Sequence, residues 1–481
     1  MEGLIIALSL VGALIAFILV LVIRAIRFKP RCVSNASSGQ IEVDVEKATN
    51  DLAEMVRIKT VSHTDHTLDD EGEFSKFKTL LQKLFPNIYE KCEYSEPSSR
   101  SLLFKLKGES SDAPTVLMAH YDVVSVEEDK WTKPPFDGII EDGVLWGRGT
   151  LDTKGTLNGA MQALEAKLKA GFIPKQDLYL AFAGDEEVNG YGASSIVKLF
   201  EEQGINPSLV LDEGGAVVEK VFPGVKKPCA VIGIAEKGIM NVEFVCESNG
   251  GHSSAPKPHT PVGKLSRACV RVESKPFKAK MCKATLALFD TVARHSTFVY
   301  RLIFANLFVF KPVLDTLGKK SGGEMNALMR TTCAFTQMKG SLGVNVIPPS
   351  ASMVANLRII PGDSCDSAIE YLKKTVNDKD IKINMLFGNN PSVISELDCD
   401  GYKRVESAVA ATWTDAIVSP YLMVACSDSR HWGRISDKVY RFSAMALSNE
   451  ERATIHGNDE RIPIDTIRKT VEFYTRILEN C

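Results

Sequence analysis

Residues 115–124, TVLMAHYDVV, decide how the rest of the chain is interpreted. The stretch begins with the apolar run Thr115–Ala119, which is typical of a short buried strand. His120 follows directly, and the carboxylate of Asp122 comes two residues later. In α/β proteins, functional side chains lie where the strands end. The stretch therefore predicts an α/β sheet with polar chemistry at one edge.

Strand-like and helix-like segments alternate on both sides of this stretch. Short apolar runs at 102–106, 178–183 and 209–211 predict further strands, and apolar residues at helical spacing predict helices over 157–170 and 193–202. Such alternation predicts a mixed sheet that is covered by helices on both faces.

The pattern changes near Glu236, where an alternating strand, a Gly-Gly break and then a long aromatic segment, 286–317, follow one another. These features indicate a second domain that is inserted into the first. A closing helix is predicted over 465–478. The predicted organisation is a transmembrane helix at 4–23, a linker at 30–43, a first domain formed by 44–235 and 361–481, and an inserted domain at 236–360.

Leu4–Ile23 is a run of 20 uncharged residues, long enough to cross a bilayer as a helix. The segment before it has no basic residue, so an uncleaved anchor is favoured over a signal peptide. Four basic residues follow the run, which favours a cytosolic location for the rest of the chain. The sequon Asn35-Ala36-Ser37 would have a role only on the luminal side.

The bulk composition excludes some classes of protein. About 440 residues remain after the apolar segment, which is too long for one compact core and favours two domains. The net charge of −3 gives no reason to expect nucleic acid as a partner. The 11 cysteines contain no CxxC pair, so a thiolate zinc ribbon is not expected.

Histidines and carboxylates recur at the ends of the predicted strands and once near the C-terminus. Each of them alone is more often a structural or solvated residue, but together they form a mixed set of nitrogen and oxygen ligands that suits divalent cations. A bridging carboxylate in such a set would allow two cations to lie about 3.5–4 Å apart. The residues concerned are His120, Asp152, Glu186, Glu187, Asp212 and His456.

The motifs around these residues occur in a fixed order: HxDVV, GRGxxDxKG, DEE, LDEGG, GGHSSxP and IHGxDE. In this order they resemble the aminoacylase/carboxypeptidase family of two-zinc peptidases, metallopeptidase family 20, over roughly residues 45–478. The segments 253–256, 308–312 and 345–349 are most similar to the branch that contains N-fatty-acyl-amino-acid synthase/hydrolases and vacuolar carboxypeptidases.

The resemblance implies a fold and a metal centre. It implies a zinc-peptidase catalytic domain, a mixed sheet flanked by helices, with an inserted ferredoxin-like α+β domain that acts as a lid and mediates dimerisation. Two zinc ions per subunit are implied, with Asp152 as the bridging ligand. His120 and Asp212 would complete one zinc site, and Glu187 and His456 the other.

The resemblance also implies roles for residues that do not bind zinc. Glu186 would be the general base that moves a proton from the attacking water to the leaving nitrogen. Asp122 would orient the imidazole of His120. His252 would reach into the partner subunit's site and stabilise the oxyanion. Arg358 would bind the substrate carboxylate, and Asn345 would contact the substrate. Cys426 departs from the family pattern, which usually has asparagine there.

The implied activity is hydrolysis, and in reverse synthesis, of the amide bond of an N-acyl amino acid whose acyl group is a long fatty chain. The aromatic stretch Phe298–Phe310 could receive that chain or touch a membrane, or it could be ordinary packing. An alternative is a membrane-anchored carboxypeptidase that releases C-terminal amino acids from peptides. A silent membrane-tethered binding protein is a third hypothesis, but every expected ligand is present. The resemblance favours a luminal or extracellular catalytic domain, with the cytosolic orientation left open.

Overall fold

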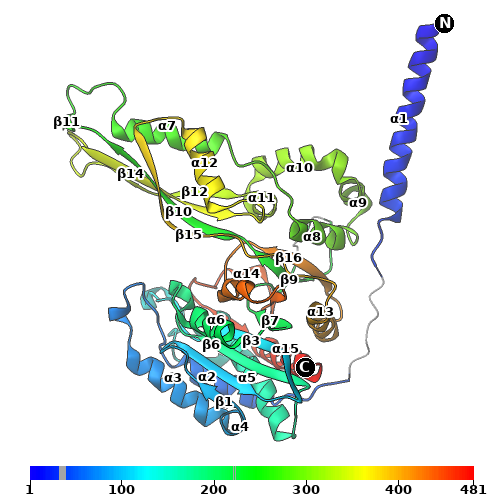
Figure 1. Ribbon diagram of the computed structural model, residues 1–481, viewed down its shortest axis with the longest axis vertical. Helices are drawn as coiled ribbons and strands as arrows, with labels where there is room; N and C mark the ends of the chain where they lie inside the picture. Colours follow the sequence, from blue (N-terminus) through cyan, green and yellow to red (C-terminus); the bar gives the residue numbers. More distant parts are fainter. Residues whose placement is uncertain (32–38, 220–221, 223) are drawn as a thin grey trace.

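A large mixed sheet forms the centre of the first domain in the computed structural model, which describes residues 1–31, 39–219, 222 and 224–481 (Figure 1). Its strand order is β1-β2-β6-β3-β7-β17-β9-β8-β18, and β16 pairs with β9. At its centre β3 (Ser110–His120) lies parallel to β6 (Gln176–Ala183) on one side and to β7 (Leu209–Asp212) on the other. Because the three strands run in the same direction, their carboxyl ends meet at one edge of the sheet.

Shorter strands extend this sheet to both sides. They are β1 (Glu93–Ser95), β2 (Ser101–Leu106), β8 (Val217–Val218), β9 (Cys229–Glu236), β16 (Ile417–Met423), β17 (Val439–Arg441) and β18 (Ala446–Leu447). A separate three-stranded sheet has the order β19-β5-β4 and consists of β4 (Ile139–Glu141), β5 (Val144–Trp146) and β19 (Arg461–Pro463).

Helices cover both faces of the large sheet, as the strand and helix alternation predicted. On one face α5 (Lys154–Lys169) packs against α15 (Ile464–Glu479) so closely that a side chain at Gly159 would meet Thr470. The other face is covered by α6 (Gly192–Gln203) and the short helix Asp428–Arg434, whose buried Trp432 packs against Phe200. The remaining helices of this domain are α2 (Val45–Val56), α3 (Glu71–Leu84), α4 (Pro86–Lys91), α13 (Asp400–Thr412) and α14 (Asn449–Arg452).

The inserted domain has its own antiparallel sheet, in the order β12-β14-β10-β15. Its strands are β10 (Gly238–Glu247), β12 (Thr332–Lys339), β14 (Ser350–Ile359) and β15 (Ile381–Asn389). Buried residues alternate with partly exposed ones along β10 and β14, because only one face of the sheet is covered by α7 (Pro261–Ser274) and α12 (Cys365–Val376). At the far end of this domain, β11 (Gly251–His252) pairs with β13 (Val346–Ile347).

The predicted boundary of the inserted domain at residue 360 is corrected by this sheet. The chain continues through α12 into β15, which pairs with β10 along its length, so the small sheet ends at Asn389. Most residues of β15 are exposed or partly exposed, and the strand therefore lacks the alternation of apolar and polar residues that identifies a half-buried strand.

The aromatic segment that was assigned to the inserted domain belongs mostly to the large core. It forms α8 (Lys283–Ala293), α9 (Phe298–Ala305), α10 (Leu307–Ser321) and α11 (Gly323–Met329). Phe289 and Phe304 pack against Phe222, with ring centroids 6.0 Å and 4.7 Å away. Apolar composition shows that a segment is buried, but it does not show against which sheet.

One helix among the described residues, α1 (Glu2–Arg27), is long and apolar enough to cross a membrane. It stands apart from the two sheets, and only its last turns approach the rest of the chain, beside α9 (Figure 1). Residues 32–38 of the predicted linker, and with them the sequon, lie outside the described residues.

Candidate functional site

The candidate site lies at the edge of the large sheet where β3, β6 and β7 end. His120 is the last residue of β3, Glu187 follows β6, and Glu213 follows β7. Asp152 lies in the loop that precedes α5, and His456 lies in the loop after α14 with a left-handed backbone (φ 57°). The sheet therefore collects residues that are far apart in the sequence at one place.

These side chains form two groups that share Asp152. One group contains His120, Asp152 and Glu213, and the other contains Asp152, Glu187 and His456. In each group the possible ligand atoms lie within 4.8 Å of one another. The two oxygens of Asp152 face different imidazoles: Oδ1 lies 3.0 Å from Nε2 of His120, and Oδ2 lies 3.0 Å from Nε2 of His456. This is the arrangement that a carboxylate bridging two cations requires.

The donor set fits divalent cations in chemistry as well as geometry. Each group contributes one imidazole and one carboxylate besides the shared Asp152, a mixture that zinc and similar metals accept. Burial, with the nearby charge of Asp152, raises the pKa of Glu213 to about 8. Hydrogen bonds to Asp152 and Glu187 raise the pKa of His456 to about 10. The buried carboxylates thus favour positive charge at this place, which bound cations would supply.

Asp212 lies outside the two groups, although the sequence predicted it as a ligand. Its buried carboxylate accepts a hydrogen bond from the backbone N–H of Ser429 at 2.9 Å. The adjacent Glu213 occupies the expected place, with Oε1 3.5 Å from Nε2 of His120. Successive side chains along a strand point to opposite faces, and here Glu213 rather than Asp212 faces the two groups. The motif DEGG contained both residues, but nothing in it indicated which of them does.

Asp122 holds the imidazole of His120 in place. Its backbone carbonyl and Oδ1 lie 3.0 Å and 3.3 Å from Nδ1 of His120, so that Nε2 is directed toward Asp152. The same fully buried carboxylate accepts hydrogen bonds from Ser62 and from the backbone N–H groups of Glu186 and Glu187. One residue therefore orients a ligand and fixes the loop that carries two more predicted site residues.

Glu460 is a positioning residue to which the sequence assigned no role. Its buried carboxylate accepts hydrogen bonds from the backbone N–H groups of Gly149, Leu151 and Asp152 and pairs with Arg148 at 2.6 Å. These contacts hold the loop that presents Asp152. The only signal in the sequence was its place in the motif around His456.

Glu186 lies near the candidate ligand groups and near the loop that contains Arg430 and Asp428. Its Oε1 is 3.9 Å from Nη1 of Arg430, and its side chain is mostly buried. Burial, and next the charge of Asp428, raise the pKa of Glu186 well above its ordinary value. A carboxyl group with a raised pKa holds a proton more readily than a free one, which suits a group that accepts and then donates a proton.

Arg358 lies on β14 at the base of the small sheet, close to the loop that contains Arg430. Its Nη1 is 3.7 Å from Sγ of Cys426, and that thiol donates a hydrogen bond to the carbonyl of Lys237 at 3.1 Å. The cysteine that departs from the family pattern therefore touches the predicted carboxylate-binding arginine.

His252 and Asn345 lie together at the opposite end of the small sheet. The backbone N–H of Ser253 donates to the carbonyl of Asn345 at 3.0 Å, and both residues are exposed. Figure 1 places β11, which carries His252, at the tip of this domain, away from the ends of β3 and β7. Within one chain the structure does not bring these two residues to the metal-binding groups.

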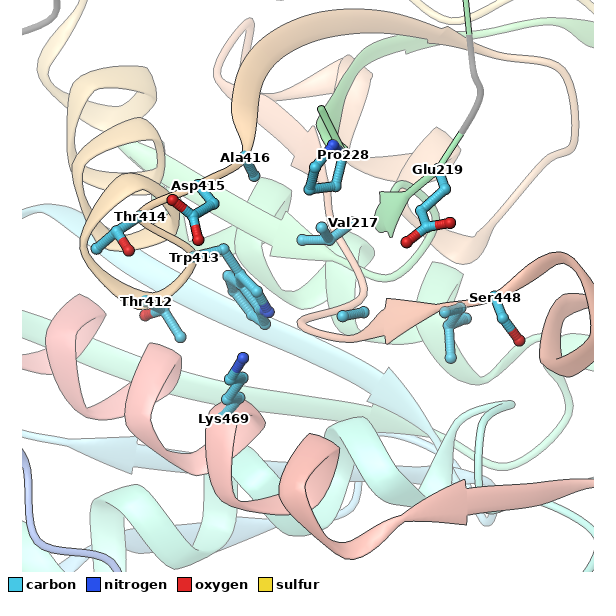
Figure 2. Close-up of a pocket in the computed structure, with 12 residues that line it drawn as sticks. Val217, Glu219, Pro228, Thr412, Trp413, Thr414, Asp415, Ala416, Ser448 and Lys469 are labelled. Carbon is cyan, nitrogen blue, oxygen red and sulfur yellow. The ribbon is translucent and has the colours of Figure 1, made fainter. Parts of the chain in front are cut away.

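A surface cavity of about 400 Å³ lies elsewhere in the first domain, between the loops after β8 and α13. In Figure 2 the side chain of Lys469 points toward Trp413 across this cavity, with Glu219 and Ser448 on the other side. None of the residues that line it belongs to the two metal-binding groups, so this cavity is separate from the candidate site.

The amino-acid sequence is similar to those of a known family and of several curated proteins. Residues 116–480 match the family described as "Peptidase family M20/M25/M40". The chain is 35% identical to "Probable carboxypeptidase S-like 2" of Dictyostelium discoideum, over 97% of this chain and 92% of that one. It is 32% identical to "N-fatty-acyl-amino acid synthase/hydrolase PM20D1" of Xenopus tropicalis, over 98% of this chain and 94% of that one.

Solved structures share the fold. The M20 family metallo-carboxypeptidase Sso-CP2 of Sulfolobus solfataricus superposes with a TM-score of 0.66 at 18% identity, covering 90% of this chain and 98% of that one. The YXEP protein of Bacillus subtilis, described as a dinuclear metal-binding peptidase, superposes with a TM-score of 0.55 at 10% identity, covering 91% of this chain and all of that one.

Proposed function

The chain belongs to the peptidase family M20/M25/M40, and on that basis we propose that it is a two-zinc amidohydrolase of N-acyl amino acids. Membership of this family makes it a metal-dependent hydrolase. The observation that carries the finer proposal is the pair of ligand groups that share Asp152, with Glu186 in the adjoining loop.

Zinc would be held by His120, Asp152 and Glu213 on one side and by Asp152, Glu187 and His456 on the other. When bound, zinc ions polarise the scissile carbonyl and make a water more acidic. Glu186 would accept the proton from the attacking water and donate it to the leaving amide nitrogen. Asp122 would keep the imidazole of His120 in its ligand orientation.

Arg358 would bind the free carboxylate that every proposed substrate carries. A guanidinium group can donate two parallel hydrogen bonds to a carboxylate and thereby fix its orientation. Arg358 lies at the junction of the small sheet and the Cys426 loop, whose Arg430 approaches Glu186. In an N-acyl amino acid, the free carboxylate and the scissile amide are attached to the same carbon atom. Arg358 would bind that carboxylate while Glu186 acts on the neighbouring amide.

For the acyl group, a long fatty chain is favoured over a peptide, because the relatives include proteins named N-fatty-acyl-amino acid synthase/hydrolase. Other relatives are named carboxypeptidase S-like, so release of C-terminal amino acids from peptides is the second candidate function. Because one site catalyses both directions, synthesis of the amide bond would depend on the concentrations of its reactants.

We further propose that α1 anchors the chain in a membrane. The helix is long enough to cross a bilayer, and nearly all of it is exposed to the surroundings. The catalytic domain would then be luminal or extracellular, although the basic residues after α1 favour the cytosol. Protease treatment of sealed microsomes distinguishes the two: a luminal domain is protected until detergent is added.

The function is tested with the full chain in detergent, loaded with zinc. Release of free amino acid is measured from long-chain N-acyl amino acids and from dipeptides that vary at their C-terminus. We expect hydrolysis of the acyl amino acids and a loss of about 100-fold or more in Glu186→Gln, with bound zinc unchanged. Hydrolysis of dipeptides alone would make the protein a carboxypeptidase. Binding of zinc without any turnover would support a silent binding protein.

A further inference from the structure

We propose that helices α9 and α10 form a membrane-docking surface that lies flat in the headgroup region beside α1. This pair of helices, residues 298–321, is called the α9–α10 elbow below. The proposal rests on the proposed membrane span of α1, and its partner is the surface of the lipid bilayer that α1 crosses.

Polar contacts attach the elbow to α1 at a defined position along the axis of that helix. Nη2 of Arg24 donates to the carbonyl of Ala305 at 2.8 Å, and Nε of Arg24 lies 3.0 Å from Oδ1 of Asn306. Nδ2 of Asn306, whose side chain is fully buried, donates to the carbonyl of Leu21 at 3.0 Å. Together these bonds set the junction of α9 and α10 beside residues 21–24 of α1.

This position along α1 coincides with the edge of the hydrocarbon layer of the proposed membrane. The uncharged residues Leu4–Ile23 span about 30 Å as a helix, which matches the thickness of the hydrocarbon core. Leu21 is two residues, or about 3 Å, from the end of this span. Because Asn306 bonds to Leu21, the junction lies at the boundary between acyl chains and headgroups.

A second set of contacts lies just beyond this boundary, where charge is tolerated. Nη2 of Arg31 pairs with Asp290 at 2.7 Å, and Nη1 of Arg294 donates to the carbonyl of Lys29 at 3.1 Å. The guanidinium of Arg294 also stacks on Phe28, 4.3 Å from the ring centroid. The chain after α1 is therefore attached to α8 and its C-terminal end, which restricts the tilt of the catalytic domain relative to the span.

On α10 the exposed Val313 and Leu317 lie one turn apart and share a face, as an interfacial helix requires. Large apolar residues are exposed on both helices, with Phe308 64% and Leu317 56% accessible. Lysines accompany them on α10, where they can pair with lipid phosphates. The exposed apolar residues are Phe298, Val299, Phe308, Val313 and Leu317, and the lysines are Lys311, Lys319 and Lys320.

The direction of α10 places this surface against the bilayer. In Figure 1, α10 runs across the direction of α1 and follows α9, which contacts α1. A bilayer crossed by α1 would therefore lie along α10 rather than end-on to it. Apolar side chains at this depth are transferred from water to the boundary of the acyl chains. The free energy that favours this transfer is roughly proportional to the apolar area that is buried.

The test uses fluorescence of the full chain reconstituted in vesicles of phosphatidylcholine and phosphatidylserine. The elbow contains none of the four tryptophans of the chain, so a tryptophan introduced there reports its own depth against the native background. Val313→Trp and Leu317→Trp probe the shared apolar face of α10 at two positions one turn apart. Leu342→Trp is the control, because Leu342 is fully exposed in the turn between β12 and β13 of the inserted domain.

With brominated acyl chains in the lipid, we expect the added fluorescence at positions 313 and 317 to fall about twofold or more and that at 342 to stay unchanged. Quenching at neither position, or at only one of the two, would overturn the proposal. Flotation of the vesicles separates the two hypotheses. A chain that does not float with them refutes the span, whereas a chain that floats without quenching refutes the docking surface alone.

Discussion

At the scale of single residues, the two adjacent acids at the end of β7 have different contacts. Glu213 faces His120 and Asp152, whereas Asp212 accepts a hydrogen bond from the backbone of Ser429. We expect Glu213→Gln to lose about one of two bound zinc ions per chain, because a neutral amide is a poor zinc ligand. Asp212→Asn should keep both ions, since an amide oxygen still accepts from Ser429. Elemental analysis of the purified variants measures this, and the reverse result would restore Asp212 as the ligand.

Arg358 provides a second test at this scale. If its guanidinium binds the substrate carboxylate, Arg358→Gln should raise KM for an N-acyl amino acid about 10- to 100-fold, the loss of one charge-assisted contact. The matched control is the same substrate with its carboxylate converted to a primary amide, which should be hydrolysed equally slowly by both enzymes. An equal loss on both substrates would indicate that Arg358 only supports the structure around Cys426.

The sequence identified most of the candidate site at this scale and missed what depends on side-chain direction. The motifs named His120, Asp152, Glu187 and His456, and the structure brings all four into the two groups. The choice between Asp212 and Glu213 depends on how the chain turns as β7 ends, and the order of letters does not contain that information. The role of Glu460 was hidden for the same reason, because its partners are backbone N–H groups about 310 residues earlier.

At the scale of elements, Lys237 occupies the connection between β9 of the large sheet and β10 of the small one. Its Nζ donates to the carbonyls of Ala327 and Arg330 at 3.0 and 2.9 Å, and its own carbonyl accepts from Cys426. Burial, and next the charge of Arg358, lower the pKa of Lys237 to about 7. A lysine buried at this connection prefers to be neutral when the chain is folded.

This shift predicts a pH dependence of stability. Between about pH 7 and pH 10 the unfolded chain binds a proton at Lys237 that the folded chain does not, so stability should rise with pH by at most about 1.4 kcal/mol per unit. Lys237→Met removes this contribution. Midpoints of urea unfolding at pH 7.5 and 9.5 measure it, with the wild type as control. An equal rise in both proteins would assign the dependence to another group.

Prediction of elements succeeded where periodicity was strong. The central strands β3, β6 and β7 and the helices α5 and α6 have the bounds that their apolar patterns indicated, within a few residues. Two assignments of segments to domains were wrong. β15 exposes most of its side chains and was not recognised as a strand of the small sheet. Helices α8–α11 are strongly apolar, but the contact of Phe289 and Phe304 with Phe222 exists only in three dimensions.

At the scale of the whole molecule, His252 lies far from the candidate metal-binding groups of its own chain (Figure 1), and we propose that it acts in the site of a partner subunit. His252 is exposed at the tip of the small sheet, and the metal-binding groups lie at the edge of the large sheet (Figure 1). The backbone N–H of Ser254 donates to Nδ1 of His252 at 3.1 Å, which leaves the proton of the neutral ring on Nε2. An exposed N–H donor of this kind suits an oxyanion in the site of a partner subunit.

This arrangement predicts that two inactive variants complement each other. Co-expressed His252→Ala and Glu186→Gln chains should form mixed dimers in which one site combines Glu186 of the first chain with the partner's His252. Random pairing makes half of the dimers mixed, with one competent site in each, so about a quarter of wild-type activity should return. Each variant expressed alone is the control. If His252 acts within its own chain, each mixed dimer has a damaged residue in both sites, and the mixture should be no more active than the controls.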